Sequence, residues 1–120
     1  MQKRILVVDD DTMNLVRTKM ILGKEYDVLM VDSGIQALDR LKCEHVDLVL
    51  LDIEMPKLNG IETFERMKEF AADIPVIFLT ASGQEDDVVS AIRLGAVNYL
   101  KKPFEPQELL KRVAQEFAKQ

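Results

Sequence analysis

Residues 46–56 read VDLVLLDIEMP, and this stretch decides the fold. The unbroken apolar run at 48–51 is too short to span a membrane and is rich in branched side chains, so it predicts a strand buried on both faces. Asp52 ends the run. Because a carboxylate is costly to bury, we expect Asp52 to surface at the carboxyl end of the strand, where open α/β sheets bind ligands. The alternative is that Asp52 only turns the chain ahead of Pro56.

Length and charge limit the classes of protein to consider. The chain has 120 residues, which suits one domain, residues 1–120, with its own core. Its net charge is −5, so we expect no direct binding to nucleic acid through a basic stripe. The single cysteine, Cys43, excludes an internal disulfide and suits a reducing compartment. The sequence shows neither a signal peptide nor a membrane-spanning stretch, so we expect a soluble cytoplasmic protein.

Strand-like and helix-like segments alternate along the chain. Four further short apolar runs predict strands at 5–8, 28–31, 76–79 and 97–100, and the last is more polar, which suits a sheet edge. Segments with helical spacing follow the strands, and the connections are short. Five such units predict an α/β fold in which helices cover a five-stranded parallel sheet.

Capping residues mark the expected helix boundaries. In the helix that begins at Thr12, Met13, Val16 and Met20 follow helical spacing, and Gly23 suits a left-handed C-terminal cap. Three later helix starts have the spacing of a capping box: Ser33 with Gln36, Asn59 with Glu62, and Ser82 with Glu85.

Two later helices add to this pattern. The helix after Ser33 is expected to carry Ile35, Leu38 and Leu41 on one face. Pro106 suits the first position of the last helix.

In a parallel sheet, the strand ends share one rim. They would bring together acids, a hydroxyl and an ammonium: Asp9, Asp10, Asp52, Thr80 and Lys102. Crowded carboxylates repel each other, and a hard divalent cation relieves that repulsion. Mg²⁺ prefers oxygen ligands and keeps several waters, so this set predicts a magnesium site. His45 stands alone in a polar loop, and no cluster of soft ligands points to another metal.

The same residues suit the transfer of a phosphoryl group. An aspartate carboxylate is a competent nucleophile and yields an aspartyl phosphate. The acids outnumber Lys102, and one Mg²⁺ offsets the excess negative charge, which leaves room for an incoming phosphoryl group. The hydroxyl of Thr80 could then donate to a phosphoryl oxygen.

Each of these residues also has an ordinary structural interpretation. Asp10 or Asp11 could cap the first helix. Thr80 could be a β-branched strand end, and Lys102 could be a solvated surface lysine. Tyr99 could be an edge-strand aromatic that covers the core. Unrelated surface residues would seldom bring acids, a hydroxyl and a lysine to four strand ends of one sheet, so we favour a single shared site.

Four motifs lie at these strand ends: VVDD at 7–10, LLDIEMP at 50–56, FLTA at 78–81 and GAVNYLKKPF at 95–104. With them, the chain resembles the receiver domain of two-component response regulators, of the chemotaxis-regulator type, over essentially its full length. The resemblance implies a flavodoxin-like (βα)5 three-layer sandwich with strand order 2-1-3-4-5. It also implies a phosphorylation-dependent signalling switch.

The resemblance assigns roles to individual residues. Asp52 would be the phospho-acceptor, Asp10 would bind Mg²⁺ directly and Asp9 would assist. Glu54 would offer its backbone carbonyl to the metal. Lys102, which directly precedes the proline, would bind the phosphoryl group, and family members commonly hold that lysine–proline bond cis.

The resemblance further implies a switch and its partners. Thr80 and Tyr99 match the family's switch pair, whose rearrangement changes the surface of the fourth helix, fifth strand and fifth helix. The phosphoryl donor would be a histidine kinase or a histidine phosphotransfer protein. The domain would then pass the signal to an output domain or to a target protein. A phosphorylation-dependent homodimer is also expected, although Val97 and Asn98 replace an acidic pair common in the winged-helix subfamily.

Two other classes of protein share part of this pattern. A haloacid dehalogenase-type phosphohydrolase also uses a nucleophilic aspartate and Mg²⁺, but Glu54 fills the place of its acid only loosely and the chain has no room for a substrate cap. A flavin carrier needs a hydroxyl- and glycine-rich loop after the first strand, whereas residues 9–14 read DDDTMN. We therefore expect a chain that catalyses only its own phosphorylation and dephosphorylation and is not otherwise an enzyme.

Overall fold

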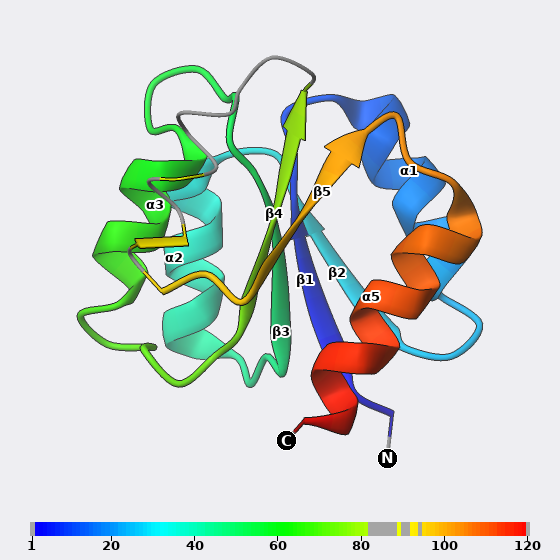
Figure 1. Cartoon of the computed structure of the whole chain (residues 1–120). Coiled ribbons are helices and arrows are strands. Elements are labelled where there is room, and N and C mark those ends of the chain that lie inside the picture. The colour runs from blue at the N-terminus through cyan, green and yellow to red at the C-terminus, as the bar shows by residue number, and fades with distance from the viewer. Residues whose placement is uncertain (1, 82–88, 90–91, 94, 120) are drawn as a thin grey trace.

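The computed structural model describes residues 2–81, 89, 92–93 and 95–119. Its elements in chain order are β1 (Arg4–Val8), α1 (Thr12–Leu22), β2 (Asp27–Val31), α2 (Gly34–Cys43), β3 (Leu48–Asp52), α3 (Gly60–Met67), β4 (Val76–Ala81), β5 (Asn98–Lys102) and α5 (Pro106–Ala118). All strand pairs are parallel, and the strand order is β2-β1-β3-β4-β5. Helices α1 and α5 cover one face of the sheet, and α2 and α3 cover the other (Figure 1). The three-layer, flavodoxin-like prediction is therefore confirmed.

The core consists of two clusters, one on each face of the sheet. Alternate residues of the central strands enter opposite clusters, which explains why these strands are continuous apolar runs. In β3, for example, Val49 and Leu51 pack with α2 and α3, whereas Leu48 and Leu50 pack with α1 and α5. Every residue of β3, including Asp52, is buried. The doubly buried strand predicted from the sequence is thus present. The expectation that Asp52 surfaces at its end is wrong, because the carboxylate is buried as the last residue of β3 and is paired with Lys102 at 3.0 Å.

The capping predictions hold to different degrees. Asn59 and Glu62 form a complete capping box at the start of α3. At α2, the Ser33 hydroxyl accepts from the Gln36 N–H, but the Gln36 side chain accepts from the Asp32 N–H instead of closing the box. The helix expected after β4, with its cap at 82 and 85, falls mainly outside the described residues.

Two predictions about helix surfaces and ends are wrong. Gly23 has a φ of −66°, in the right-handed region, because the chain continues into a turn in which the Tyr26 N–H donates to the Leu22 carbonyl. Ile35 is 52% exposed and does not share the buried face of Leu38. It lies in the first turn of α2, where the neighbouring Gly34 is the residue packed closely against α3.

Helix α1 also presents an apolar surface to solvent. Its buried residues are Leu15, Thr18 and Leu22. The three residues with helical spacing, Met13, Val16 and Met20, are instead 76%, 45% and 72% exposed. We call these three residues the α1 stripe.

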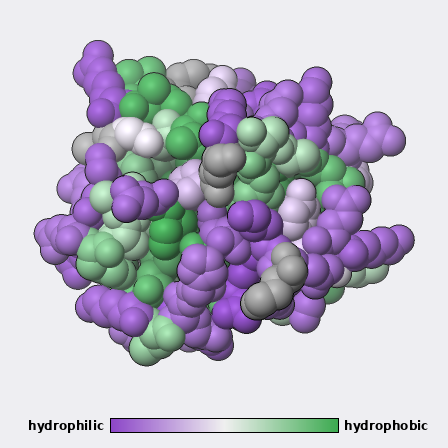
Figure 2. Space-filling view, turned by 90° about the horizontal axis from the view of Figure 1, so that it is seen from below, coloured by the Kyte–Doolittle hydropathy of each residue, from purple (hydrophilic) through white to green (hydrophobic). Residues whose placement is uncertain are grey.

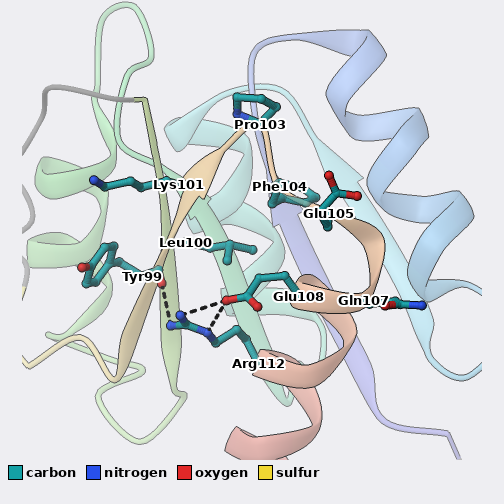
Figure 3. Close-up of a pocket in the computed structure, with 9 residues that line it drawn as sticks. All are labelled: Tyr99, Leu100, Lys101, Pro103, Phe104, Glu105, Gln107, Glu108 and Arg112. Atoms are coloured by element: carbon teal, nitrogen blue, oxygen red, sulfur yellow. Dashed lines mark hydrogen bonds and ion pairs between the residues drawn. The ribbon is translucent and has the colours of Figure 1, made fainter.

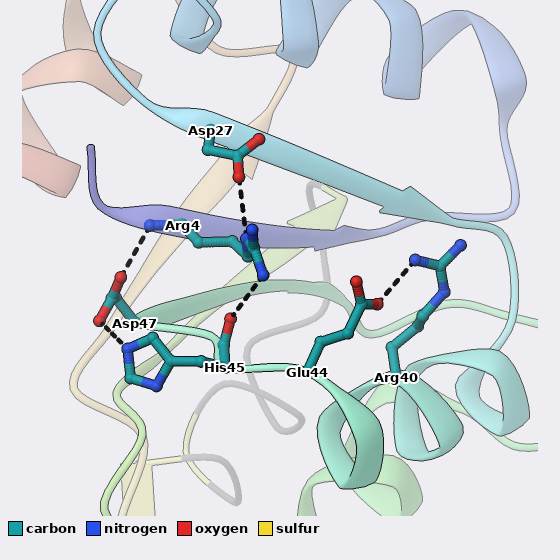
Figure 4. Close-up of polar contacts among 6 residues, drawn as sticks. All are labelled: Arg4, Asp27, Arg40, Glu44, His45 and Asp47. Atoms are coloured by element: carbon teal, nitrogen blue, oxygen red, sulfur yellow. Dashed lines mark hydrogen bonds and ion pairs between the residues drawn. The ribbon is translucent and has the colours of Figure 1, made fainter. Parts of the chain in front are cut away.

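Polar contacts tie together the amino ends of the strands, at the end of the molecule shown in Figure 2, where hydrophilic residues surround smaller hydrophobic areas. Arg4 pairs with Asp27 at 2.8 Å, and its N–H donates to Asp47 (Figure 4). His45 lies 2.7 Å from the other oxygen of Asp47. Burial acts to raise the pKa of Asp47, but the Arg4 N–H and His45 together lower it. Among the described residues, no helix has both the length and the apolar character needed to cross a bilayer.

Candidate functional site

Three carboxylates meet at the carboxyl ends of β1 and β3. These strands are neighbours, and Val8 pairs with Leu51, so Asp9 and Asp52 follow at the same level. Asp9 and Asp52 are each only 1% exposed, whereas Asp10 is exposed. One carboxylate oxygen from each of the three lies within 4.8 Å of the others, a spacing at which they could hold a metal ion.

Lys102 reaches this cluster from the edge strand β5, across β4. Its Nζ lies 3.3 Å from Oδ2 of Asp9 and 3.0 Å from Oδ2 of Asp52. The Lys102 side chain is 18% exposed, so it is not the solvated surface lysine of the ordinary interpretation. The peptide bond from Lys102 to Pro103 is cis.

The two central charges of the site perturb each other. Burial raises the pKa of Asp52 to about 6, a rise that Lys102 opposes and the nearby Asp9 carboxylate reinforces. Burial acts to lower the pKa of Lys102, but Asp52 and Asp9 outweigh it and leave that pKa raised. The carboxylates therefore keep the Lys102 ammonium charged, whereas burial makes Asp52 easier to protonate than an ordinary aspartate in spite of that ammonium.

Backbone donors orient the carboxylates. The Asp11 N–H donates to Oδ1 of Asp9 at 2.9 Å, and the Glu54 N–H donates to Oδ1 of Asp52 at 3.2 Å. The Asp11 side chain accepts from the Met13 N–H and caps α1. Of the two candidates for that cap, Asp11 fills it.

Of the remaining predicted residues, Glu54 is joined to the site only through its backbone N–H, and in the described part of the chain the side chains of Thr80 and Tyr99 make no polar contact with the acids or with Lys102. Thr80 is buried in β4, one residue beyond the partner of Asp52, and its hydroxyl donates to the Ala81 carbonyl at 3.2 Å. Tyr99 lies in the edge strand and is 37% exposed. The Glu54 side chain is exposed.

A surface pocket of about 580 Å³ lies beside Tyr99, between β5 and α5 (Figure 3). Its lining includes Tyr99, Phe104 and Arg112. The Arg112 guanidinium donates to the Tyr99 carbonyl at 3.1 Å and to the Asn98 side chain at 2.6 Å. It also pairs with Glu108 one turn earlier on α5. Asn98, one of the two residues that stand in place of the winged-helix subfamily's acidic pair, is therefore hydrogen-bonded within the chain.

Two residues that support the site were not singled out from the sequence. Gly60 donates its N–H to the Ile53 carbonyl, and a Cβ atom there would lie 2.7 Å from the Ile53 Cα, so only glycine fits beside the backbone of Asp52. The Asn-Gly pair at the start of a capped helix is a weak signal for it. Arg17 donates to the Phe104 carbonyl at 2.7 Å, and nothing in the local sequence indicates that long-range contact.

The sequence matches a known protein family and several of its members. Residues 5–114 match the family model of the response regulator receiver domain. The chain is 39% identical over 114 residues to the alkaline phosphatase synthesis transcriptional regulatory protein PhoP of Bacillus subtilis (strain 168), covering 94% of this chain and 48% of PhoP. It is 44% identical over 111 residues to the transcriptional regulatory protein CpxR of Escherichia coli (strain K12), covering 92% of this chain and 47% of CpxR.

A solved structure agrees with these relatives. The CheY-like response regulator receiver domain protein from Methanospirillum hungatei JF-1 matches with a TM-score of 0.94 and 31% identity, covering 99% of this chain and 96% of that one. The chain spans about half the length of the curated relatives it matches. On these matches, together with the parallel sheet and its acidic rim, the chain belongs to the response regulator receiver domain family of two-component systems.

Proposed function

We propose that Asp52 accepts a phosphoryl group from a histidine kinase or a histidine phosphotransfer protein, and that this changes the surface the domain presents to a partner. The observation that carries the proposal is the ion pair between Asp52 and Lys102 inside a cluster of acids. A nucleophilic carboxylate, a fixed cation and oxygen ligands for a metal are the parts that phosphoryl transfer to an aspartate requires.

The proposed cofactor is Mg²⁺. All the clustered side chains offer carboxylate oxygens, the ligands that this hard cation prefers at about 2.1 Å. We assign Asp10 and Asp52 as direct ligands, Asp9 as an assisting acid and Glu54 as the donor of a backbone carbonyl. When bound, Mg²⁺ would offset the negative charge that gathers on the transferring group.

The proposed step is a displacement at phosphorus. A carboxylate oxygen of Asp52 forms a bond to phosphorus while the bond from phosphorus to the donor's nitrogen or oxygen breaks, and the leaving group keeps the electron pair. The Lys102 ammonium would contact a phosphoryl oxygen. The Thr80 hydroxyl would turn from the Ala81 carbonyl to donate to another oxygen.

The proposed switch follows from that last movement. Thr80 lies in β4 beside β5, and Phe78 of β4 pairs with Tyr99, so a change at Thr80 is next to the edge strand. The phosphoryl group would shift an existing equilibrium by its different contacts with the two states. The affected surface would be that of β5, α5 and the helix before β5.

We propose that the phosphodonor protein docks over α1. The α1 stripe begins at Met13, next to the acidic loop of 9–11, so a partner covering it would bring its phosphoryl group near Asp52. The signal would pass to an output domain or a separate target. No direct nucleic-acid binding by this domain is proposed, and a phosphorylation-dependent homodimer and a cytoplasmic location remain predictions.

We also propose that the chain catalyses only its own phosphorylation and dephosphorylation. A phosphohydrolase would instead release phosphate repeatedly from a small ester such as p-nitrophenyl phosphate. Multiple turnovers per protein molecule would favour that class.

Intact mass spectrometry tests the proposal directly. Incubation with acetyl phosphate and Mg²⁺ should add the mass of one phosphoryl group to the wild type, and Asp52→Asn should abolish the addition. Asp11→Asn is a matched control, because it removes a charge from the same rim but keeps an acceptor for the cap of α1. Equal labelling of wild type and Asp52→Asn would refute the assignment.

A further inference from the structure

The position of Lys102 depends on the loop that follows it. Lys102 is the last residue of β5, which lies at the edge of the sheet and pairs with β4. The next residue, Pro103, has no N–H to donate to a neighbouring strand. The loop after Lys102, whose ammonium lies between Asp9 and Asp52, is therefore held by contacts outside the strand ladder, and the Glu105 carbonyl accepts from the Leu109 N–H at the start of α5.

Arg17 of α1 makes such a contact in two ways. Its Nη2 donates to the Phe104 carbonyl at 2.7 Å, and its Cζ lies 5.0 Å from the centroid of the Phe104 ring. A hydrogen bond from a charged donor is stronger than one between neutral groups. Attraction between the guanidinium and the ring adds to it.

Phe104 is an effective anchor because its ring is already fixed. It is 7% exposed and belongs to the cluster formed by α1, α5 and one face of the sheet, where Leu15, Leu100 and Leu109 also lie. With the ring buried in the core, the hydrogen bond from Arg17 restrains the orientation of the Phe104 peptide. That peptide lies two residues after Lys102.

Helix α1 is thereby connected both to the acids that follow β1 and to the lysine at the end of β5. It begins at Thr12, directly after the loop that carries Asp9 and Asp10, and Asp11 caps it. Arg17 lies between one and two turns further along the same helix. One rigid element thus holds the β1 acids at its start and the loop after Lys102 through its side chain.

We propose that Arg17 is a positioning residue for Lys102, holding the Phe104 peptide so that the ammonium is directed at Asp9 and Asp52. The inference rests on the proposed function, because the task of Lys102 is to contact the incoming phosphoryl group. Among the described residues, the polar and cation–π contacts of Arg17 are with Phe104, so it acts on Lys102 through the loop.

The test compares Arg17→Ala with Arg17→Lys and with the matched control Lys19→Ala, an exposed cation on the same helix. The first measurement is the rate of reductive methylation of Lys102 in the metal-free protein, read by peptide mass spectrometry. Arg17→Ala should speed the reaction severalfold at Lys102 alone, because a loosened ammonium is more accessible. Lys19→Ala should react as the wild type does.

The second measurement separates positioning from general damage. Arg17→Ala should slow labelling by acetyl phosphate about tenfold, since small misplacements of a catalytic group are costly. Its affinity for Mg²⁺ should be unchanged or higher, because the ammonium competes with the cation for the same carboxylates. Arg17→Lys, which keeps a donor and a charge near the ring, should restore much of the labelling rate.

The outcomes are distinguishable. Unchanged methylation of Lys102 in Arg17→Ala would overturn the inference, and so would a loss of Mg²⁺ affinity that parallels the loss of labelling. If the wild type accepts no phosphoryl group, the proposed function fails, but the methylation rates still decide whether Arg17 positions Lys102.

Discussion

The Nζ atom of Lys102 lies 3.0 Å from Oδ2 of Asp52, although strand β4 separates the strands that carry them. The same ammonium lies 3.3 Å from Asp9, so one lysine partly neutralises two buried carboxylates. A divalent cation at this rim would share those carboxylates. The stability of the metal-free protein and its response to Mg²⁺ should therefore be coupled through Lys102.

Lys102→Met should make the metal-free protein less stable and more responsive to Mg²⁺. Removing one partner of a buried ion pair leaves the acids unpaired, and because Lys102 is partly exposed we expect a loss of about 2 kcal/mol in the free energy of unfolding. Added Mg²⁺ should raise the Tm of the variant more than that of the wild type. Thermal unfolding with and without Mg²⁺ measures both effects. Lys101→Met, at an exposed neighbour, should respond as the wild type does, and equal Mg²⁺ shifts in all three proteins would argue against a shared site.

Asp52→Asn should change how stability depends on pH. In the metal-free protein the pKa of Asp52 is raised from 3.8 to about 6, chiefly by burial. The unfolded chain therefore loses this proton at a lower pH than the folded protein does, so the stability contributed by the group falls as pH rises through about 6. In EDTA, the Tm of the wild type should fall relative to that of Asp52→Asn between about pH 4 and about pH 7. A constant difference over that range would contradict the raised pKa.

Gly60→Ala should destabilise the protein by about 1–3 kcal/mol, the usual cost of forcing atoms into a filled space. An added Cβ would lie 2.7 Å from the Ile53 Cα, and backbone has little freedom to withdraw. Because the displaced segment carries Asp52, the variant should also bind Mg²⁺ more weakly. Chemical denaturation and Mg²⁺ titration measure the two effects. Wild-type values in both would show that the backbone at Ile53 moves aside without a measurable cost in stability.

Lys57→Gly should stabilise the protein. Lys57 has a φ of 66° in the loop between β3 and α3, a left-handed conformation that costs a side chain about 1–2 kcal/mol and glycine almost none. Part of that gain is offset because glycine makes the unfolded chain more flexible, so the expected net gain is below about 1 kcal/mol. Lys57→Ala removes the charge but keeps the strained backbone and should leave the Tm near that of the wild type. If both variants gain equally, the charge and not the backbone is responsible.

The sheet was predictable because its central strands are buried on both faces and so leave unbroken apolar runs in the sequence. Which side of each helix is buried was harder to predict. Met13 and Met20 recur at helical spacing as core residues would, yet they are exposed, because spacing alone does not say which side of a helix faces the sheet. The prediction of a left-handed cap at Gly23 was wrong because the chain beyond it forms a turn that keeps right-handed backbone geometry.

The acids of the site were predictable because parallel strands deliver their last residues to one rim. The residues that support those acids were not. Arg17 and Phe104 are 87 residues apart, and Gly60 matters only because the backbone after Asp52 passes close to it. Such contacts depend on the packing of distant segments, which one sequence does not display.

Localising the phosphoryl group within the chain tests the central claim most directly. After labelling with acetyl phosphate and Mg²⁺, borohydride reduces an aspartyl phosphate to homoserine, which peptide mass spectrometry can place at one residue. The account predicts homoserine at position 52 in the wild type. Homoserine at position 9 or 10, or at none, would contradict it.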